Sequence, residues 1–487
     1  MTTQRVKALE AFLEQRGASW ARGKVEMTTE GVVHGFGVVA KSTIAEGEEI
    51  FRIPREAAFG AGLLAGTSEN ERDDNNENGD EDEVEHRDSQ MSHALLLLAE
   101  RAKGSETSPW APLWATLPEP STYEDLPWLW PAERGEAVKG TALELPIANK
   151  KTRIEEEWKA LVARGETSVD LESYAHACGV ILSHLNPFFG GAVVPFVYML
   201  NCSNTNEPNV EFESEETEEG DEVVVGRAIC DIAAGEELTQ AYGNDISNAE
   251  LVYRCGFALP QAELRDVVDV GYASEVQAGK ERIQEVNLLQ RAGVIAACAW
   301  DGLEDVLTIE VSKDSGLTEL RVACAVRGLD DATLAKFCEY CGLSGAEASP
   351  LSAGKAAGLS VKKQRLDEMD CVAVLLCACL DAVERGEWPP STAKSHAAML
   401  GAARKSEAIK DDEDEDDEDD EDEDEDEVLW DVLRPVLASK AVQHATEVLR
   451  TRMARIEASA SARSGEVAME QLAAAETKLL NSVLQRT

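Results

Sequence analysis

The fold of this chain is indicated most clearly by two segments, VVPFVYMLNCSNTNEPNVEF (193–212) and VVVGRAICDIAAGEELTQAYGNDISNAELVYRCGFALP (223–260). Residues 209–212 alternate between apolar and polar side chains, and residues 223–232 are rich in β-branched side chains, so both predict strands. A turn is expected around Gly235, and residues 238–242 resume an extended pattern. This part of the chain is therefore expected to be built from short strands.

A capping box predicts a short helix directly after these strands. The Ser247 hydroxyl can accept a hydrogen bond from the backbone N–H of Glu250, and the Glu250 carboxylate can reach back. We expect a helix over 248–255 that ends at Gly256 in the left-handed conformation.

A second informative segment lies near the N-terminus, where HGFGVVA (34–40) is followed by IAEGEEIFRIP (44–54). It predicts a tight turn, a strand, a turn at Gly47 and a second strand. Pro54 ends that strand because proline has no N–H to donate to a ladder. The Gly35-x-Gly37 pair alone marks a tight turn more often than a site, and it lacks the third glycine and the helix of a dinucleotide fingerprint.

In this order, the segments resemble a SET domain of the Rubisco and ribosomal-protein lysine N-methyltransferase branch. The resemblance is carried by GFGVVA (35–40), NCSNTNEPN (201–209), GEEL (235–238), AYG (241–243) and SNAEL with CGF (247–257). The Trp-rich segment from 110 to about 163 is similar to the helical insert of that branch, although its tryptophans are also typical of a buried packing layer.

The resemblance implies an α+β fold. A SET-type β fold of short strands, with a pseudoknot-like C-terminal motif and a helical insert at about 91–180, would occupy residues 1–265. An all-α domain of the substrate-binding type would occupy residues 266–487. Ala-rich amphipathic patterns support the second part, with helices expected at 281–297, 319–327, 332–341, 366–385, 428–458 and 466–485. Only 305–311 has a weak extended pattern there.

The net charge of −47 is concentrated in three segments. Residues 411–427, 69–88 and 211–222 carry −17, −9 and −8, which is −34 of the total. Runs of like charge are usually solvated and disordered, and we expect all three to be disordered acidic loops. The alternative is an electrostatic field that attracts basic partners. Direct nucleic acid binding is disfavoured because the phosphates would be repelled.

Several classes of protein are excluded by simple patterns. No apolar run approaches the ~20 residues that span a bilayer, so no membrane contact is expected. No signal peptide is expected, and the scattered cysteines indicate a reducing interior, in the nucleus or the cytoplasm or both. The pair Cys338 and Cys341 is only half of a zinc site, so we expect no metal.

The resemblance also implies a pocket for S-adenosylmethionine. Its candidate residues are Gly35, Phe36, Gly37, Ser183, His184, Asn201, Cys202, Tyr242 and Phe257. Cys202 replaces the family's His, and Ser183-His184 replaces its Ser-Arg pair. An Asn amide suits a zwitterion because it offers both a donor and an acceptor.

Tyr242 is the catalytic candidate, since the family's tyrosine directs its hydroxyl at the methyl-transfer axis. The lysine would enter from the opposite face through an aromatic channel, for which Phe188, Phe189 and Tyr198 are candidates. Each of these three can equally be a core residue. Tyr198 also stands where some relatives have Asp.

The sequence therefore predicts an S-adenosylmethionine-dependent protein-lysine N-methyltransferase whose substrate is a basic protein, a ribosomal protein ahead of a histone tail. Two alternatives stay open. One is a catalytically inactive SET fold that acts as an acidic binding module or chaperone for basic proteins. The other is an enzyme with the same cofactor that methylates histidine.

Overall fold

The structure is a computed structural model. It describes residues 2–62, 81–119, 126–203, 207–217, 220–242, 246–259, 267–271, 283–291, 293–297, 307–312, 316–340, 379–380, 382–387, 433–434 and 441–485. The expected acidic run 411–427, the second half of the Cys338–Cys341 pair and most of the helix expected at 366–385 lie outside these residues.

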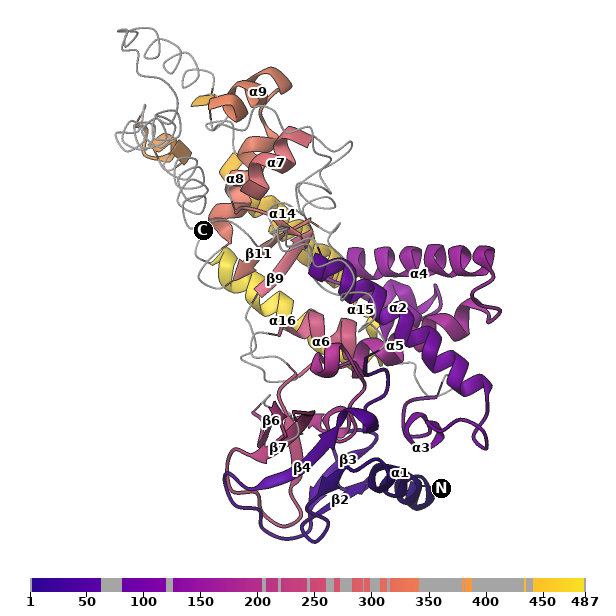
Figure 1. The fold of residues 1–487 in the computed structure, drawn as a ribbon. Coiled ribbons are helices and arrows are strands. Elements are labelled where there is room, and N and C mark those ends of the chain that lie inside the picture. The colour runs from indigo at the N-terminus through magenta and orange to yellow at the C-terminus, as the bar shows by residue number, and fades with distance from the viewer. Residues whose placement is uncertain are drawn as a thin grey trace, which may run out of the picture.

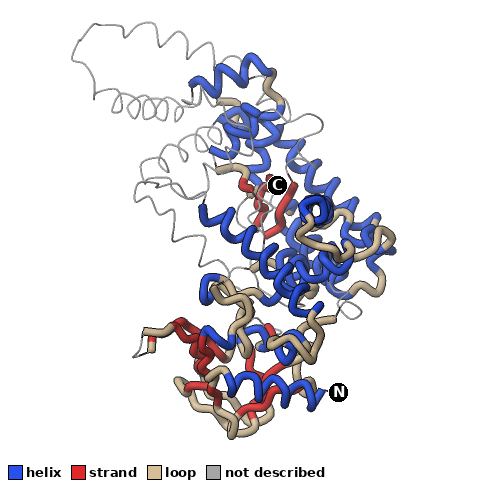
Figure 2. The backbone as a smooth tube through the Cα atoms, turned by 45° about the vertical axis from the view of Figure 1, so that its right-hand side comes forward, coloured by secondary structure: helices blue, strands red, loops and turns tan. Residues whose placement is uncertain are grey.

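Two four-stranded sheets form the lower part of the molecule in Figure 1, and they are the red strands of the lower half of Figure 2. The first sheet has antiparallel strands in the order β1 (Ser19–Trp20), β4 (Glu49–Pro54), β7 (Glu222–Ala228) and β6 (Val210–Glu216). The second has the order β2 (Val25–Thr28), β3 (Gly37–Ala40), β8 (Glu237–Gln240) and β5 (Asn201–Cys202). Only the pair β5 and β8 is parallel.

A glycine in the first sheet makes room for an aromatic core residue. Phe51 of β4 lies opposite Gly226 of β7, and a Cβ on Gly226 would lie 2.3 Å from the Phe51 ring. The ring can therefore stack on Phe196, with centroids 5.1 Å apart. The sheet is thus joined by direct packing to the segment that leads into β5.

Helices cover these sheets and form the insert. They are α1 (Thr2–Gln15), α2 (Glu81–Ala102), α3 (Ala111–Trp114), α4 (Glu144–Arg164), α5 (Leu171–His184) and α6 (Asn248–Cys255), with 3-10 turns at Arg55–Ala57, Pro127–Leu129, Arg134–Val138, Phe188–Gly190 and Val197–Met199. The α5 helix begins where the Asp170 side chain accepts from Ser173 N. Helices α2 and α5 pack side by side. Trp128 and Trp130 are buried, which confirms the expected aromatic layer.

The predicted helix after the strands is confirmed in detail. Ser247 Oγ accepts from Glu250 N at 3.1 Å, α6 spans Asn248–Cys255, and Gly256 has a φ of 80°. Each of these features follows from local sequence alone, because capping and the left-handed stop need no distant partner.

The prediction that residues 211–222 form a disordered loop is wrong. Most of the segment lies in β6, β7 and the turn between them, and β6 pairs with β7 from Val210 opposite Ala228 to Glu216 opposite Glu222. The physical reason is that basic side chains on neighbouring strands offset the acids: Arg227 binds Glu213 at 2.7 Å, and Arg52 binds Glu215 at 3.1 Å.

The prediction that residues 69–88 form a disordered loop is wrong in part, since α2 already begins at Glu81.

The prediction of an all-α second domain is wrong in one respect. A three-stranded antiparallel sheet has the order β10 (Ala296–Ala297), β11 (Leu307–Ser312) and β9 (Val267–Gly271). β11 overlaps the extended segment expected at 305–311, so that expectation is confirmed. β9 is rich in β-branched residues, which fit a pleated surface, but it is too short to stand out among helical patterns. The described helices here are α7 (Ile283–Arg291), α8 (Leu317–Arg327), α9 (Asp331–Tyr340), α14 (Ala441–Ala458), α15 (Ala460–Arg463) and α16 (Val467–Leu484).

Two hydrophobic cores share the helix α16. The first core contains residues from Leu9 to Ala258 and also Met469 and Leu472 of α16. The second begins at Val268 and includes the later part of α16 up to Val483. In Figure 1 this helix runs in yellow from the level of α6 toward β9, and it contacts both elements. The C-terminal helices are therefore part of the packing of both halves.

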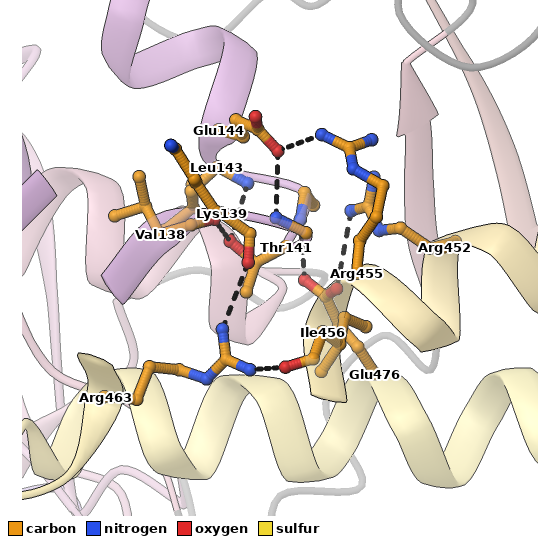
Figure 3. A network of polar contacts seen from close by, with 12 residues as sticks. Val138, Lys139, Thr141, Leu143, Glu144, Arg452, Arg455, Ile456, Arg463 and Glu476 are labelled. Carbon is orange, nitrogen blue, oxygen red and sulfur yellow. Dashed lines mark hydrogen bonds and ion pairs between the residues drawn. The ribbon is translucent and has the colours of Figure 1, made fainter. Parts of the chain in front are cut away.

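A polar network joins the insert to the C-terminal helices (Figure 3). Glu476 of α16 accepts from Ala142 N at 2.9 Å and from the Arg452 guanidinium at 3.4 Å. Glu144, at the start of α4, accepts from Gly140 N at 2.8 Å and pairs with Arg455 of α14.

The same junction has a second cationic contact and a close backbone approach. Arg463 donates to the carbonyl of Lys139 at 3.1 Å and to that of Ile456. Gly140 has a φ of 80°, and a Cβ there would lie 2.5 Å from Ile456 N. No side chain fits this position, so the backbones of the insert and α14 approach as closely as glycine permits.

We expect Gly140→Ala to lower the free energy of unfolding by about 2–4 kcal/mol, because it combines a strained positive φ with a backbone clash. Urea unfolding followed by circular dichroism would measure it. Gly135→Ala is the matched control, since a Cβ there meets nothing within 4 Å. Equal stability of the two variants would contradict the close packing of this junction.

Candidate functional site

The loop before β3 is held by two side chains from distant parts of the sequence. Asn201 Nδ2 donates to the carbonyls of His34 and Phe36, at 2.9 and 3.2 Å, and to Glu237 Oε1 at 2.7 Å. Glu237 Oε2 accepts from Val33 N at 2.7 Å. The structure thus brings the predicted Gly35–Gly37 segment and Asn201 together.

Two glycines allow this loop to take its shape. Gly35 has a φ of 52°, in the left-handed region that suits glycine. At Gly37 a Cβ would lie 2.5 Å from the Val32 side chain and 2.8 Å from Glu237 Oε1. The G-x-G pattern is therefore a requirement of backbone conformation and close approach.

Asn209 anchors the strand that lies beside this loop. Its Oδ1 accepts from Thr239 N at 2.7 Å and its Nδ2 donates to the Glu237 carbonyl at 2.8 Å, so one amide bonds to two backbone groups of β8. Asn209 is buried. This side chain therefore joins the start of β6 to β8.

The segment before β5 owes its course to packing. Phe196 has a φ of 65°, which is rare for a residue with a Cβ. Its ring stacks on Phe51 and lies 5.7 Å from the ring of Trp20. These contacts hold the strained residue and direct the chain through Val197–Met199 into Asn201.

An aromatic pair lies in the same cluster as Cys202, the second residue of β5. The Tyr242 and Phe257 rings are 5.9 Å apart and tilted by 67°. They pack against a small cluster of Cys202, Ile246, Leu251 and Leu259. Burial raises the pKa of the Cys202 thiol, which therefore stays neutral and acts as an apolar side chain.

Gln240 connects the two groups, although no motif in the sequence marks it as a site residue. Its Nε2 donates to the carbonyls of Val197 and Leu200 at 2.7 and 2.8 Å. The Tyr242 hydroxyl lies 3.5 Å from the same Leu200 carbonyl. Gln240 of β8 thus fixes the carbonyl of Leu200, the residue before Asn201, and the Tyr242 hydroxyl lies beside that carbonyl.

Ser183 and His184 have contacts of another kind. Ser183 Oγ donates to the Arg254 carbonyl at 2.6 Å and so links the end of α5 to α6. The His184 ring bonds to the Val180 carbonyl within its own helix, and burial lowers its pKa to about 4. Neither of these two hydrogen bonds is with the loop of residues 33–37 or with Asn201. Their assignment to a cofactor pocket stays a prediction.

The three channel candidates are spread over different contacts. Phe188 packs on Phe212 with centroids 5.8 Å apart, while Phe189 is buried beneath the guanidinium of Arg55. The Tyr198 hydroxyl is 2.5 Å from Thr116 Oγ1 in the insert. Phe189 belongs to the first hydrophobic core, and Phe188 and Tyr198 pack against it. Their channel role stays a prediction.

The described residues contain neither a metal-binding cluster nor a membrane-spanning helix. Within the described ranges, no three His, Cys, Asp or Glu residues lie where they could hold a metal ion. Cys338 has a weak contact with the Gln284 carbonyl at 3.7 Å. Among the helices whose residues the structure describes, none is long and apolar enough to cross a membrane.

Comparison with known proteins places this site in a family context. Residues 35–243 match the SET domain family. The chain is 25% identical over 359 residues to N-lysine methyltransferase setd6 of Salmo salar, covering 66% of this chain and 73% of that protein. It is 23% identical to N-lysine methyltransferase SETD6 of Bos taurus, covering 63% and 69%.

Solved structures agree on the fold. The structure of Rubisco LSMT bound to AdoMet superposes with a TM-score of 0.50 at 17% identity, covering 92% of each chain. The SET domain of LSMT bound to lysine and AdoHcy gives 0.50 at 15% identity, covering 98% of this chain and 91% of that chain. The predicted SET-type α+β fold is confirmed.

The half-buried His184 ring generates a prediction for pH dependence. Its folded-state pKa lies below the ordinary value of 6.5, so the unfolded chain takes up the proton first as the pH falls. Wild type should therefore lose about 1–2 kcal/mol more stability than His184→Asn between pH 7.5 and pH 5. Urea unfolding at both pH values measures it, and the difference at pH 7.5 isolates any packing effect. Parallel losses would show that His184 does not titrate in this way.

Proposed function

We propose that this SET-domain protein is an S-adenosylmethionine-dependent protein-lysine N-methyltransferase that acts on a basic protein, with a ribosomal protein ahead of a histone tail as the substrate. The SET domain and the N-lysine methyltransferase relatives support the enzyme class. The observation that carries the proposal is that the two residues of the short strand β5 contact a polar loop, through Asn201, and the cluster of an aromatic pair, through Cys202.

The residues of this site fit the cofactor by their chemistry. The amide of Asn201 and the backbone of residues 34–36 form a polar end that suits an amino acid zwitterion. Phe257 and the apolar cluster around Cys202 form the other end, which suits a heterocyclic ring. Gly35 leaves open space where a Cβ would stand, so a ligand can approach the backbone there.

The chemistry requires a neutral lysine amine. A free lysine has a pKa of about 10.4, and reaching the amine at neutral pH costs about 4–5 kcal/mol. The bound cofactor supplies the methyl group. The chain supplies a partly buried apolar surface that disfavours the ammonium form, and the Tyr242 hydroxyl and the Leu200 carbonyl as two adjacent polar groups. What remains is alignment of the reacting groups.

The charge of the chain supports a basic substrate. A net charge of −47 creates a field that favours the approach of cationic partners. Part of the acidic hairpin of β6 and β7 is used internally, because Glu213 and Glu215 pair with arginines. The run at 411–427 carries the largest single share of the negative charge, −17 of −47.

We place the protein in the nucleus or the cytoplasm. No disulfide joins the cysteines that the structure describes, among them the buried Cys178, Cys202 and Cys324. Buried cysteines outside disulfides are typical of reducing compartments.

The binding-module alternative rests on Cys202, His184 and Tyr198. The His184 ring is engaged within its own helix, and the Tyr198 hydroxyl is engaged with Thr116. Cofactor binding separates the two functions, because a binding module for basic proteins has no need of S-adenosylmethionine. Product analysis separates lysine from histidine as the acceptor.

We expect S-adenosylmethionine to bind with one-to-one stoichiometry, and Asn201→Ala to weaken binding at least about tenfold through loss of the loop contacts. Isothermal titration calorimetry measures both. Asn186→Ala is the control, because that amide donates only to the His184 carbonyl. Absence of heat with wild type would favour the binding module.

We expect Tyr242→Phe to lower methyl transfer at least about a hundredfold while cofactor affinity changes little, because the ring is kept and only the hydroxyl is lost. Labelled cofactor with ribosomal-protein and histone fractions measures transfer and compares the two substrates. Tyr174→Phe is the control, since that hydroxyl faces Glu157 at 3.5 Å. Full activity of Tyr242→Phe would remove Tyr242 from the mechanism.

A further inference from the structure

Glu237 uses both carboxylate oxygens on the loop side of the candidate site. Oε2 accepts from Val33 N and Oε1 accepts from Asn201 Nδ2, each at 2.7 Å. Val33 lies 204 positions before Glu237 in the sequence, and Asn201 lies 36 positions before it. The carboxylate is thus a bridge between the loop and the strand β5.

The position of this carboxylate is set by the backbone of β8. Glu237 is paired with Val39 across the β3–β8 ladder, and its carbonyl accepts from the Asn209 amide at 2.8 Å. The side chain is half-buried. Hydrogen bonds from N–H donors to a charged acceptor are the stronger class, so this bridge is a firm restraint.

The charge of Glu237 is used for these N–H donors. Within the described part of the chain no ion pair involves Glu237, in contrast to Glu213, Glu215 and Glu250. Gly37 belongs to the same arrangement, since a Cβ there would lie 2.8 Å from Glu237 Oε1. Both the glycine and the carboxylate are fitted to one loop conformation.

We infer that Glu237 is a positioning residue that holds residues 33–36 and Asn201 in the arrangement that receives the amino acid end of the cofactor. The inference rests on the proposed function. Glu237 acts through Asn201 and the loop backbone and not on a reacting atom. The inference assigns a specific role to Glu237, the second glutamate of the GEEL segment at 235–238.

The variants Glu237→Gln and Glu237→Ala test this role. Gln keeps one acceptor oxygen and Ala keeps none, so affinity should fall about tenfold for Ala and by a smaller factor for Gln. S-adenosylmethionine and S-adenosylhomocysteine share the same amino acid end, so both should weaken by the same factor. At saturating cofactor kcat should be largely kept, while the KM for the cofactor rises. Isothermal titration and steady-state kinetics measure these effects.

A readout without cofactor completes the test. In Glu237→Ala the amides of residues 33–37 should exchange hydrogen faster, while β6 and β7 keep the wild-type rate. Glu236→Ala is the matched control, because that carboxylate caps its own turn at Ala233 N. It should behave as wild type in every measurement.

Three results would overturn the inference. The first is that Glu237→Ala leaves cofactor affinity and amide hydrogen exchange unchanged. The second is that affinity falls for S-adenosylmethionine but not for S-adenosylhomocysteine. The third is that Glu236→Ala lowers affinity as much as Glu237→Ala does. Failure of wild type to bind either ligand would instead overturn the proposed function itself, and the inference with it. Where Glu237→Ala unfolds, Glu237→Gln carries the same comparison, because its shape is preserved.

Discussion

The arrangement of the site depends on β8, a strand of only four residues that has neighbours on both edges. It pairs antiparallel with β3 on one side and parallel with β5 on the other. The Asn209 amide bonds to its backbone from a third direction. Such a strand cannot slip by one residue without losing all these bonds together and turning each side chain to the opposite face.

This constraint explains why successive residues of β8 and its extension serve different parts of the site. Glu237 faces the glycine loop, Gln240 faces the carbonyls before Asn201, and Tyr242 lies beside Leu200. The alternation of side chains along a strand distributes these roles. The cofactor side and the catalytic candidate are thus fixed by one piece of backbone, while Phe196 sets the course of the opposing segment.

The features that the sequence predicted correctly from the residues alone depend on neighbouring residues in the chain. The helix α6, its Ser247 cap and its Gly256 stop are complete within ten residues, and all three were found. The glycine loop and Asn201 were found through family resemblance, which already encodes their contact.

Glu237 and Gln240 were missed as site residues because their partners are distant in sequence, and nothing near them marks which carbonyl or amide they will meet. The acidic hairpin was misassigned for the same reason, since Arg52 lies more than 160 residues from Glu215. The strand β9 was too short to be separated from the helical patterns around it.

The sharing of α16 between two cores has a consequence for how the chain can be made. Met469 and Leu472 belong to the core that otherwise ends at Ala258, so that core is incomplete until residues more than 200 positions later have been synthesised. Chains generally fold domain by domain from the N-terminus as they emerge from the ribosome. Here the first core cannot be completed, and apolar surface of the insert stays exposed, until α16 has been synthesised. The order of synthesis and the order of assembly therefore differ, and chaperones that shield apolar surface would have most to protect during that interval.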